Sequence, residues 1–366
     1  MTHAWLVTGP PGSGRSVAAL CFAAALQCTF DGVPGCGQCR ACTTTMAGTH
    51  ADVRRVIPEG LSIGVGDMRS IVQIASRRPG TGRWQIVLIE DADRLTEGAA
   101  NALLKIVEEP PPSTVFLLCA PSVDPEDIAI TLRSRCRHVE LVTPSVEAIA
   151  QVLTDADGLA EVDARWAASV SGGHVGRARR LATDPEARQR RQQALGLARD
   201  AATLSRAYAA AAELVAAADA EARELTVGRD EAETEELRTA LGAGGTGKGT
   251  AGALRGAAGA IKDLEQRQKS RLTRAHRDAL DRALIDLAAY FRDALLVASR
   301  AGEVPANHPD MADRVAALAA HATPERLLRC IEAVLECREA LAANVKPKFA
   351  IGALVAAVGQ ALRPDL

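Results

Sequence analysis

Short runs of apolar residues alternate with helical spacing over the first 140 residues of the chain. Between the runs, apolar residues recur every three or four positions over residues 16–26, 68–75 and 96–107, which predicts helices, and Asp67 is expected to cap the second of them. Strands that alternate with helices predict a parallel sheet with helices on both faces. The apolar runs predict its strands at residues 4–8, 53–57, 85–89, 115–119 and 137–141.

The second part of the chain has no strand pattern. Residues 145–184 predict short helices, and the Ala-, Leu- and Arg-rich sequence after them predicts long ones. Glycines crowd residues 242–259, which predicts a flexible linker between helices. We therefore expect an α/β domain over residues 1–143, a small helical region over 144–184 and an all-helical domain over 185–366.

Composition narrows the class of protein. The apolar fraction of 48% and the charged fraction of 24% are typical of a globular chain and exclude disorder as the main state. With 43 basic and 45 acidic residues the formal net charge is −2, which argues against a free-standing DNA-binding protein. No targeting or membrane segment is visible, so a cytoplasmic location is expected and the nine cysteines are not expected to form disulfides.

The segment Gly9-Pro10-Pro11-Gly12-Ser13-Gly14-Arg15-Ser16 follows a strand and opens a helix, which is the context of a phosphate-binding loop. Glycines such as Gly9, Gly12 and Gly14 let backbone N–H groups converge on phosphate oxygens at a helix N-terminus. The pattern has Lys before Ser16, and here the residue is Arg15, whose bulkier guanidinium places its charge differently. The sequence thus predicts the loop, but without the lysine that the hydrolytic pattern contains. A plain strand-to-helix turn is the alternative.

The buried strand over residues 85–89 ends in Glu90-Asp91, where such ATPases hold Mg²⁺ and polarise water. The usual order is Asp and then Glu. The reversal gives each carboxylate the wrong reach by one methylene, so it fits with the change at Arg15. An acidic strand end without a role is the alternative.

Four cysteines lie close together as Cys28-x7-Cys36-x2-Cys39-x2-Cys42. This spacing fits tetrahedral thiolate coordination of a structural zinc ion, and four thiolates would leave no open position for catalysis. An iron–sulfur cluster also takes four thiolates and is the main alternative.

Arg135 stands in Leu132-Arg133-Ser134-Arg135-Cys136, just before the last predicted strand. An arginine at the edge of a nucleotide fold is able to reach the γ-phosphate held by a neighbouring subunit, as an arginine finger does. On the pattern alone, a surface ion pair is the more common use of such a residue.

Together these features resemble the bacterial clamp-loader proteins of the AAA+ family. The resemblance covers residues 3–181, and the remainder matches only in its helical character. It implies an AAA+ P-loop nucleotide fold with an inserted zinc module at 28–42, then an all-α lid over 144–184 and an all-α collar over 185–366. The features occur in one order: the phosphate loop, the four cysteines, the acidic strand, Asn101-Ala102-Leu103-Leu104-Lys105-x-x-Glu108-Glu109-Pro110-Pro111, and Ser134-Arg135-Cys136.

The resemblance also implies roles for single residues. Arg135 corresponds to the finger that acts on the ATP of the adjacent motor (gamma/tau) subunit. Arg177, in Gly173-His174-Val175-Gly176-Arg177, corresponds to the second sensor. The four cysteines correspond to zinc ligands. One class of subunit in this family commonly lacks working hydrolytic motifs, which the departures at Arg15 and Glu90-Asp91 fit.

The resulting hypothesis is a non-motor, stator-like subunit of a clamp loader whose own ATP hydrolysis is absent or weak. Its implied partners are the motor and delta subunits and the sliding clamp, with primed DNA contacted mainly through the complex and no membrane. Structural Zn²⁺ is the expected cofactor, while ATP with Mg²⁺ in its own site is left open. One alternative is a working ATPase, either the motor (gamma/tau) subunit or another AAA+ enzyme. A second is a zinc-dependent interaction protein that keeps an AAA+ shell without a replication role.

Overall fold

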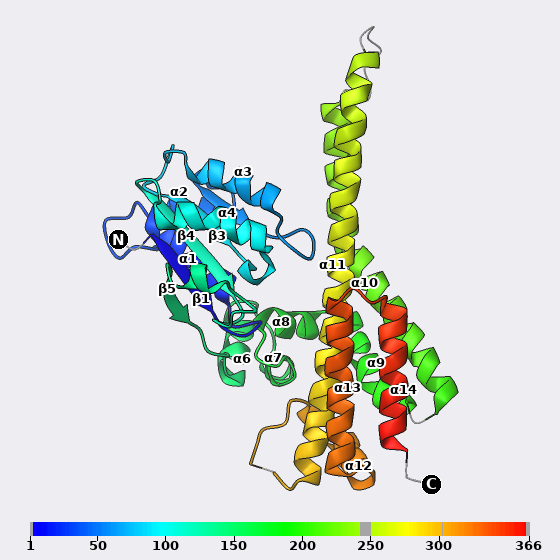
Figure 1. The fold of residues 1–366 in the computed structure, drawn as a ribbon. Coiled ribbons are helices and arrows are strands. Elements are labelled where there is room, and N and C mark those ends of the chain that lie inside the picture. The colour runs from blue at the N-terminus through cyan, green and yellow to red at the C-terminus, as the bar shows by residue number, and fades with distance from the viewer. Residues whose placement is uncertain (1–2, 202, 242–249, 302, 364–366) are drawn as a thin grey trace. The chain divides into compact units, whose positions relative to one another are not determined.

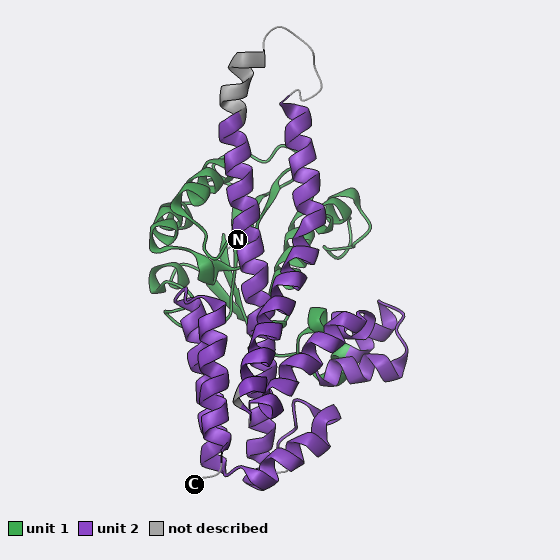
Figure 2. Ribbon diagram, turned by 90° about the vertical axis from the view of Figure 1, so that its right-hand side faces the viewer, with its two compact units in different colours: residues 1–149, 173–177 green, residues 150–172, 178–366 purple. Residues whose placement is uncertain are grey.

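The computed structural model describes residues 3–201, 203–241, 250–301 and 303–363. The chain forms two compact units, coloured separately in Figure 2. The first comprises residues 1–149 and 173–177, and the second comprises residues 150–172 and 178–366. The segment 173–177 therefore returns to the first unit after the chain has already entered the second.

A five-stranded sheet forms the centre of the first unit (Figure 1). Every neighbouring pair of strands is parallel, in the order β2-β3-β4-β1-β5. All five predicted strands are confirmed, each within one residue of its predicted ends. They are β1 (Ala4–Thr8), β2 (Val53–Val56), β3 (Gln85–Ile89), β4 (Thr114–Ala120) and β5 (Arg137–Glu140).

The sheet separates two apolar cores. In β4, Phe116 and Leu118 belong to one core, whereas Val115 and Leu117 belong to the other. This alternation follows from the pleat, which points successive side chains to opposite faces. Because both faces are covered, β3 and β4 are buried at every position and are apolar nearly throughout.

Helices cover the two faces of this sheet. Residues of α1 pack into the core on one face, and residues of α3, α4 and α5 pack into the core on the other. The predicted cap of α3 is wrong, because Gly64 is its N-cap and Asp67 lies inside its first turn, where a carboxylate still stabilises the N-terminal end of the helix dipole. The helices of this region are α1 (Arg15–Gln27), α2 (Arg40–Met46), α3 (Val65–Ala75), α4 (Glu97–Glu108) and α5 (Ile130–Arg133).

The rest of the described chain is helical. Leu280, Leu284, Leu287 and Phe291 recur at helical spacing on α11 and are fully buried or nearly so in a core shared with α9, α10, α12, α13 and α14. Among the described residues, no helix has the length and apolar character needed to cross a membrane. The helices are α6 (Val146–Asp155), α7 (Glu161–Ser169), α8 (Val175–Thr183), α9 (Pro185–Asp200), α10 (Leu204–Ala240), α11 (Thr250–Ala298), α12 (Ala312–His321), α13 (Pro324–Ala342) and α14 (Pro347–Leu362).

The long helices α10 and α11 run side by side (Figure 1). Arg271 of α11 pairs with Asp230 and Glu233 of α10. The predicted linker is wrong in part, because residues 250–259 belong to α11, where alanines between the glycines favour a helix. Residues 242–249 of that prediction lie outside the described residues.

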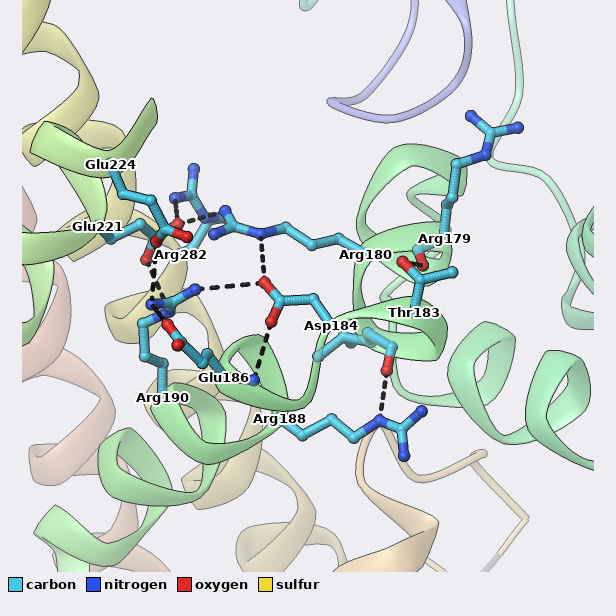
Figure 3. Close-up of polar contacts among 11 residues, drawn as sticks. Arg179, Arg180, Thr183, Asp184, Glu186, Arg188, Arg190, Glu221, Glu224 and Arg282 are labelled. Atoms are coloured by element: carbon cyan, nitrogen blue, oxygen red, sulfur yellow. Dashed lines mark hydrogen bonds and ion pairs between the residues drawn. The ribbon is translucent and has the colours of Figure 1, made fainter. Parts of the chain in front are cut away.

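A cluster of ion pairs connects α8 and α9 to α10 and α11 within the second unit (Figure 3). Its centre is Glu221 of α10, whose side chain is 8% exposed. Glu221 pairs with Arg180 of α8, lies 3.4 Å from Arg190 of α9, and accepts a 2.6 Å hydrogen bond from Arg282 of α11. Asp184 caps α9 by accepting a hydrogen bond from the backbone N–H of Glu186.

Candidate functional site

The predicted phosphate loop joins β1 to α1 and contains backbone that only glycine adopts easily. Gly12 has φ of 91°, and a side chain there would place its Cβ 2.5 Å from Cα of His174. Gly14, with φ of 86°, is the N-cap of α1. The glycines thus allow a tight loop and the close approach of His174, which belongs to the segment that returns to this unit.

Arg15 folds back onto its own loop. Its Nη1 donates a 2.8 Å hydrogen bond to the carbonyl oxygen of Gly9. The neighbouring Ser16 lies in the first turn of α1 and is half-buried. The guanidinium that replaces the expected lysine is therefore partly engaged by the loop that carries it.

The acidic end of β3 lies near the phosphate loop. Burial raises the pKa of the Cys119 thiol in β4 to about 12, and the charges of Arg15, Glu90 and Asp91 also act on that thiol. Because β1, β4 and β3 are parallel neighbours, the loop that carries Arg15 and the acids Glu90 and Asp91 lie at the same carboxyl edge of the sheet. Burial also raises the pKa of the Asp93 carboxyl, and the Asp91 charge adds to that effect.

Glu90 is held by Arg55, an arginine that lies outside the sequence motifs. Its Oε1 accepts hydrogen bonds from Nε and Nη2 of Arg55, at 2.8 and 2.5 Å, and its side chain is only 14% exposed. Arg55 lies on β2, the strand next to β3. Its charge inside a predicted strand was the available signal, since a charged residue there needs a partner.

Arg135 lies just after α5 and pairs with Glu108, the last residue of α4. Its Nη1 donates to the carbonyl oxygen of Thr131 at 2.8 Å and to Oγ of Ser134 at 3.2 Å. Both side chains of the ion pair are partly exposed, at 36% for Arg135 and 44% for Glu108. Arg135 thus forms the kind of surface ion pair that its sequence pattern alone favours, and its partner Glu108 belongs to the Asn101–Pro111 motif.

Arg177 lies in the first turn of α8, in the segment that belongs to the first unit. Its backbone N–H donates to Nδ1 of His174 at 3.2 Å, and His174 is the residue that approaches Gly12. Arg177 is therefore anchored, through the backbone, to a residue in contact with the phosphate loop.

The four cysteines of the predicted metal site come together at the end of α1 and the start of α2. Their sulfur atoms all lie within 4.8 Å of one another. Four thiolates arranged tetrahedrally about 2.3 Å from a zinc ion stand about 3.8 Å apart, and Sγ of Cys39 lies 3.9 Å from Sγ of Cys28. The cluster therefore has the geometry to bind a metal ion.

Backbone N–H groups reinforce this cluster. The N–H of Cys39 donates to Sγ of Cys36 at 3.3 Å, and the N–H of Cys42 donates to Sγ of Cys39 at 3.5 Å. Backbone hydrogen bonds, first from Thr29, lower the pKa of Cys39 to about 5, whereas burial raises the pKa of Cys42 to about 12. Donors directed at sulfur stabilise thiolates, which is the form that ligates a metal.

Comparisons with known proteins fall on the two ends of the chain. Residues 1–145 match the family model described as DNA polymerase III, delta subunit, and residues 270–348 match the C-terminal model of the DNA polymerase III delta subunit. The DNA polymerase III subunit delta' of Escherichia coli is 38% identical over 145 residues, which are 39% of this chain and 43% of that protein.

Two further relatives also match only part of this chain. The subunit delta' of Pseudomonas aeruginosa is 36% identical over 204 residues, covering 53% of this chain and 60% of the relative. The DNA polymerase III subunit tau of Bacillus subtilis is 34% identical over 149 residues, covering 40% and 26%. The chain thus spans less than two thirds of the length of the relatives it matches.

Proposed function

We propose that this chain, whose first 145 residues match the DNA polymerase III delta-subunit family, is a delta'-type subunit of the bacterial clamp loader. The observation that carries the proposal is this match together with delta' relatives at 36 to 38% identity. The second match, over residues 270–348, supports it from the other end of the chain, because its model is also one of a polymerase III delta subunit.

The proposed role is that of a stator within a ring of subunits. At the two motif positions that hydrolysis depends on, the side chains present are departures from the usual residues and are engaged within the fold: Arg15 by the carbonyl oxygen of Gly9, and Glu90 by Arg55. These contacts support a subunit whose own turnover of ATP with Mg²⁺ is absent or weak. A working motor of the gamma/tau type, the alternative, would need a free lysine and the Asp-Glu order at these positions.

The partners follow from this role. The chain would assemble with the motor (gamma/tau) and delta subunits, act on the sliding clamp, and meet primed DNA mainly through the complex. Residues 1–143 would be the AAA+ domain, 144–184 the lid with Arg177 as second sensor, and 185–366 the collar. Co-purification with the motor subunit, the delta subunit and the clamp tests this assignment directly, and failure of the chain to join that complex would contradict it.

Arg135 is proposed as the arginine finger that stabilises charge on the γ-phosphate bound by the adjacent motor subunit. We expect R135A to lower single-turnover hydrolysis at that site by about 10³-fold, while the ring still assembles. The matched control is R133A, since Arg133 is an exposed arginine two residues away. Normal hydrolysis by an assembled R135A complex, measured with clamp and DNA present, would refute the finger assignment.

Structural zinc is proposed for Cys28, Cys36, Cys39 and Cys42. When bound, the metal would supply cross-links between the end of α1 and the start of α2, where this chain has no disulfide. We expect elemental analysis to find one zinc per chain, and C39S to abolish it. C21S is the control, because Cys21 is an exposed cysteine outside the cluster. Iron in place of zinc, or full zinc content in C39S, would contradict the site.

A further inference from the structure

The ion pair between Glu108 and Arg135 in the first unit has no role in the function proposed above. Both terminal nitrogens of the Arg135 guanidinium have partners: Nη2 pairs with Glu108, and Nη1 donates to Thr131 and Ser134. A guanidinium binds a phosphate through the same N–H groups that it offers to a carboxylate. Arg135 therefore cannot present this edge to a neighbouring phosphate without first leaving Glu108.

The position of Glu108 is electrostatically unfavourable for the helix that carries it. Glu108 is the last residue of α4, and a second acid, Glu109, is the C-cap. The C-terminal end of a helix carries partial negative charge, so carboxylates there are destabilising. The sequence nevertheless places two of them next to each other, and one of them meets Arg135.

The strength of the contact suits a reversible hold. Both side chains are partly exposed, and exposed ion pairs are weak because water screens them. A phosphate group of a bound nucleotide carries more charge than one carboxylate and offers several acceptor oxygens, so it competes well for the same guanidinium.

We propose that Glu108 is a positioning residue that holds Arg135 within its own subunit until the neighbouring γ-phosphate takes it over. This inference rests on the proposed function, because it needs Arg135 to act in trans. Glu108 thereby limits hydrolysis at the neighbouring site for as long as Arg135 stays paired within its own subunit.

The test is a double-mutant cycle in the reconstituted complex of this chain with the motor and delta subunits, assayed without clamp or DNA. E108Q keeps the side-chain size and removes the charge. We expect it to raise the maximal rate of ATP hydrolysis by about two- to fivefold, the range that the weakness of an exposed ion pair allows. The KM for ATP should stay unchanged, because Glu108 does not act on the bound nucleotide before the finger engages.

Two controls separate this role from a structural one. E109Q removes the neighbouring charge at the same helix end and should behave as the unmodified protein. In the double variant E108Q/R135A the gain should vanish, leaving the rate of R135A alone. Equal melting temperatures for E108Q and E109Q would exclude loss of folding as the cause of any change.

The outcomes distinguish the two proposals. An unchanged or lower rate in E108Q, or a gain that survives in the double variant, overturns the holding role while the finger stands on the effect of R135A. If R135A itself hydrolyses ATP normally, the finger assignment fails and the role of Glu108 fails with it.

Discussion

Side chains that the sequence marks as chemically important are largely engaged by one another or by nearby backbone. Arg15 bonds its own loop, Glu90 is held by Arg55, and Arg135 pairs with Glu108. An arginine takes part in each of these contacts, because its planar guanidinium group offers several N–H donors at fixed angles. The identity of each partner depends on which strands and helices become neighbours. The sequence therefore indicates the important residues but not the residues that they contact.

The buried side chain of His308 makes the stability of the protein depend on pH. It is 2% exposed, and its Nδ1 accepts a 2.8 Å hydrogen bond from Arg191, so the proton lies on Nε2, which donates to the carbonyl oxygen of Asp286. Burial, and then the Arg191 charge, lower the pKa of His308 from its ordinary 6.5, although Asp286 and Asp293 oppose this shift. Protonation would lose the Arg191 hydrogen bond and place two cations together.

The direction in which pH changes the stability follows from which state, folded or unfolded, binds the proton more tightly. Because the folded-state pKa lies below 6.5, the unfolded chain takes up a proton first as the pH falls, and stability decreases below about pH 6.5. We expect the free energy of unfolding in urea to fall between about pH 7 and pH 5, by at most about 1.4 kcal/mol per pH unit from this group. H308Q should flatten that fall, while H321Q, at an exposed histidine, should not. Identical pH dependence in H308Q and the unmodified chain would contradict the prediction.

For helices and strands, the pattern of apolar residues predicted the elements correctly, whereas polar residues and glycines predicted their ends less well. The strands followed from apolar runs, because parallel strands buried on both faces must be apolar almost throughout. The cap predicted at Asp67 is wrong, because an Asp is favourable both as an N-cap and within the first turn of a helix. The linker predicted at 242–259 is wrong over residues 250–259, because a helix can accommodate glycines that alternate with alanines. The local sequence thus predicted an element correctly where its apolar residues are also buried.

Thr96 gives a prediction for one element. Its Oγ1 caps α4 by accepting the N–H of Ala99 at 3.3 Å, and it donates to the carbonyl oxygen of Ile63 at 3.2 Å. We expect T96A to lower the free energy of unfolding by about 1 kcal/mol, the usual cost of losing an N-cap. S70A, inside α3 and exposed, should change it by less than about 0.5 kcal/mol. Equal urea midpoints for the two variants would show that the cap contributes nothing.

In the molecule as a whole, neither of the two compact units is a single continuous stretch of the chain. Residues 173–177 return to the first unit, where His174 approaches Gly12, while residues 150–172 belong to the second. Helix α8 therefore begins in one unit and ends in the other. Its last turn carries Arg180, which joins the cluster around Glu221 shown in Figure 3.

Glu221 is the test of that cluster. It is the buried carboxylate among Arg180, Arg190 and Arg282, so E221Q would leave three arginines with less compensating charge. We expect a loss of about 1–2 kcal/mol in the free energy of unfolding, because E221Q removes the buried charge of three ion pairs while Asp184 still pairs with Arg180 and Arg190. E224Q is the control, since Glu224 is 61% exposed and lies 3.7 Å from Arg190. Urea unfolding followed by circular dichroism measures both, and a loss no larger in E221Q than in E224Q would refute the role.

The amino-acid sequence alone was sufficient to predict the parallel sheet, the positions of its strands, the glycine-rich loop that leads into α1, and the grouping of four cysteines. These are local properties, because periodicity, glycine content and residue spacing act over a few positions of the chain. The folded structure adds the pairing of Arg55 with Glu90, the approach of His174 to Gly12, the ion pair of Glu108 with Arg135, and the contacts of Glu221 with three arginines. Each of these contacts joins residues that lie far apart in the sequence, and their pairing follows from how sheets and helices pack, which no local pattern encodes.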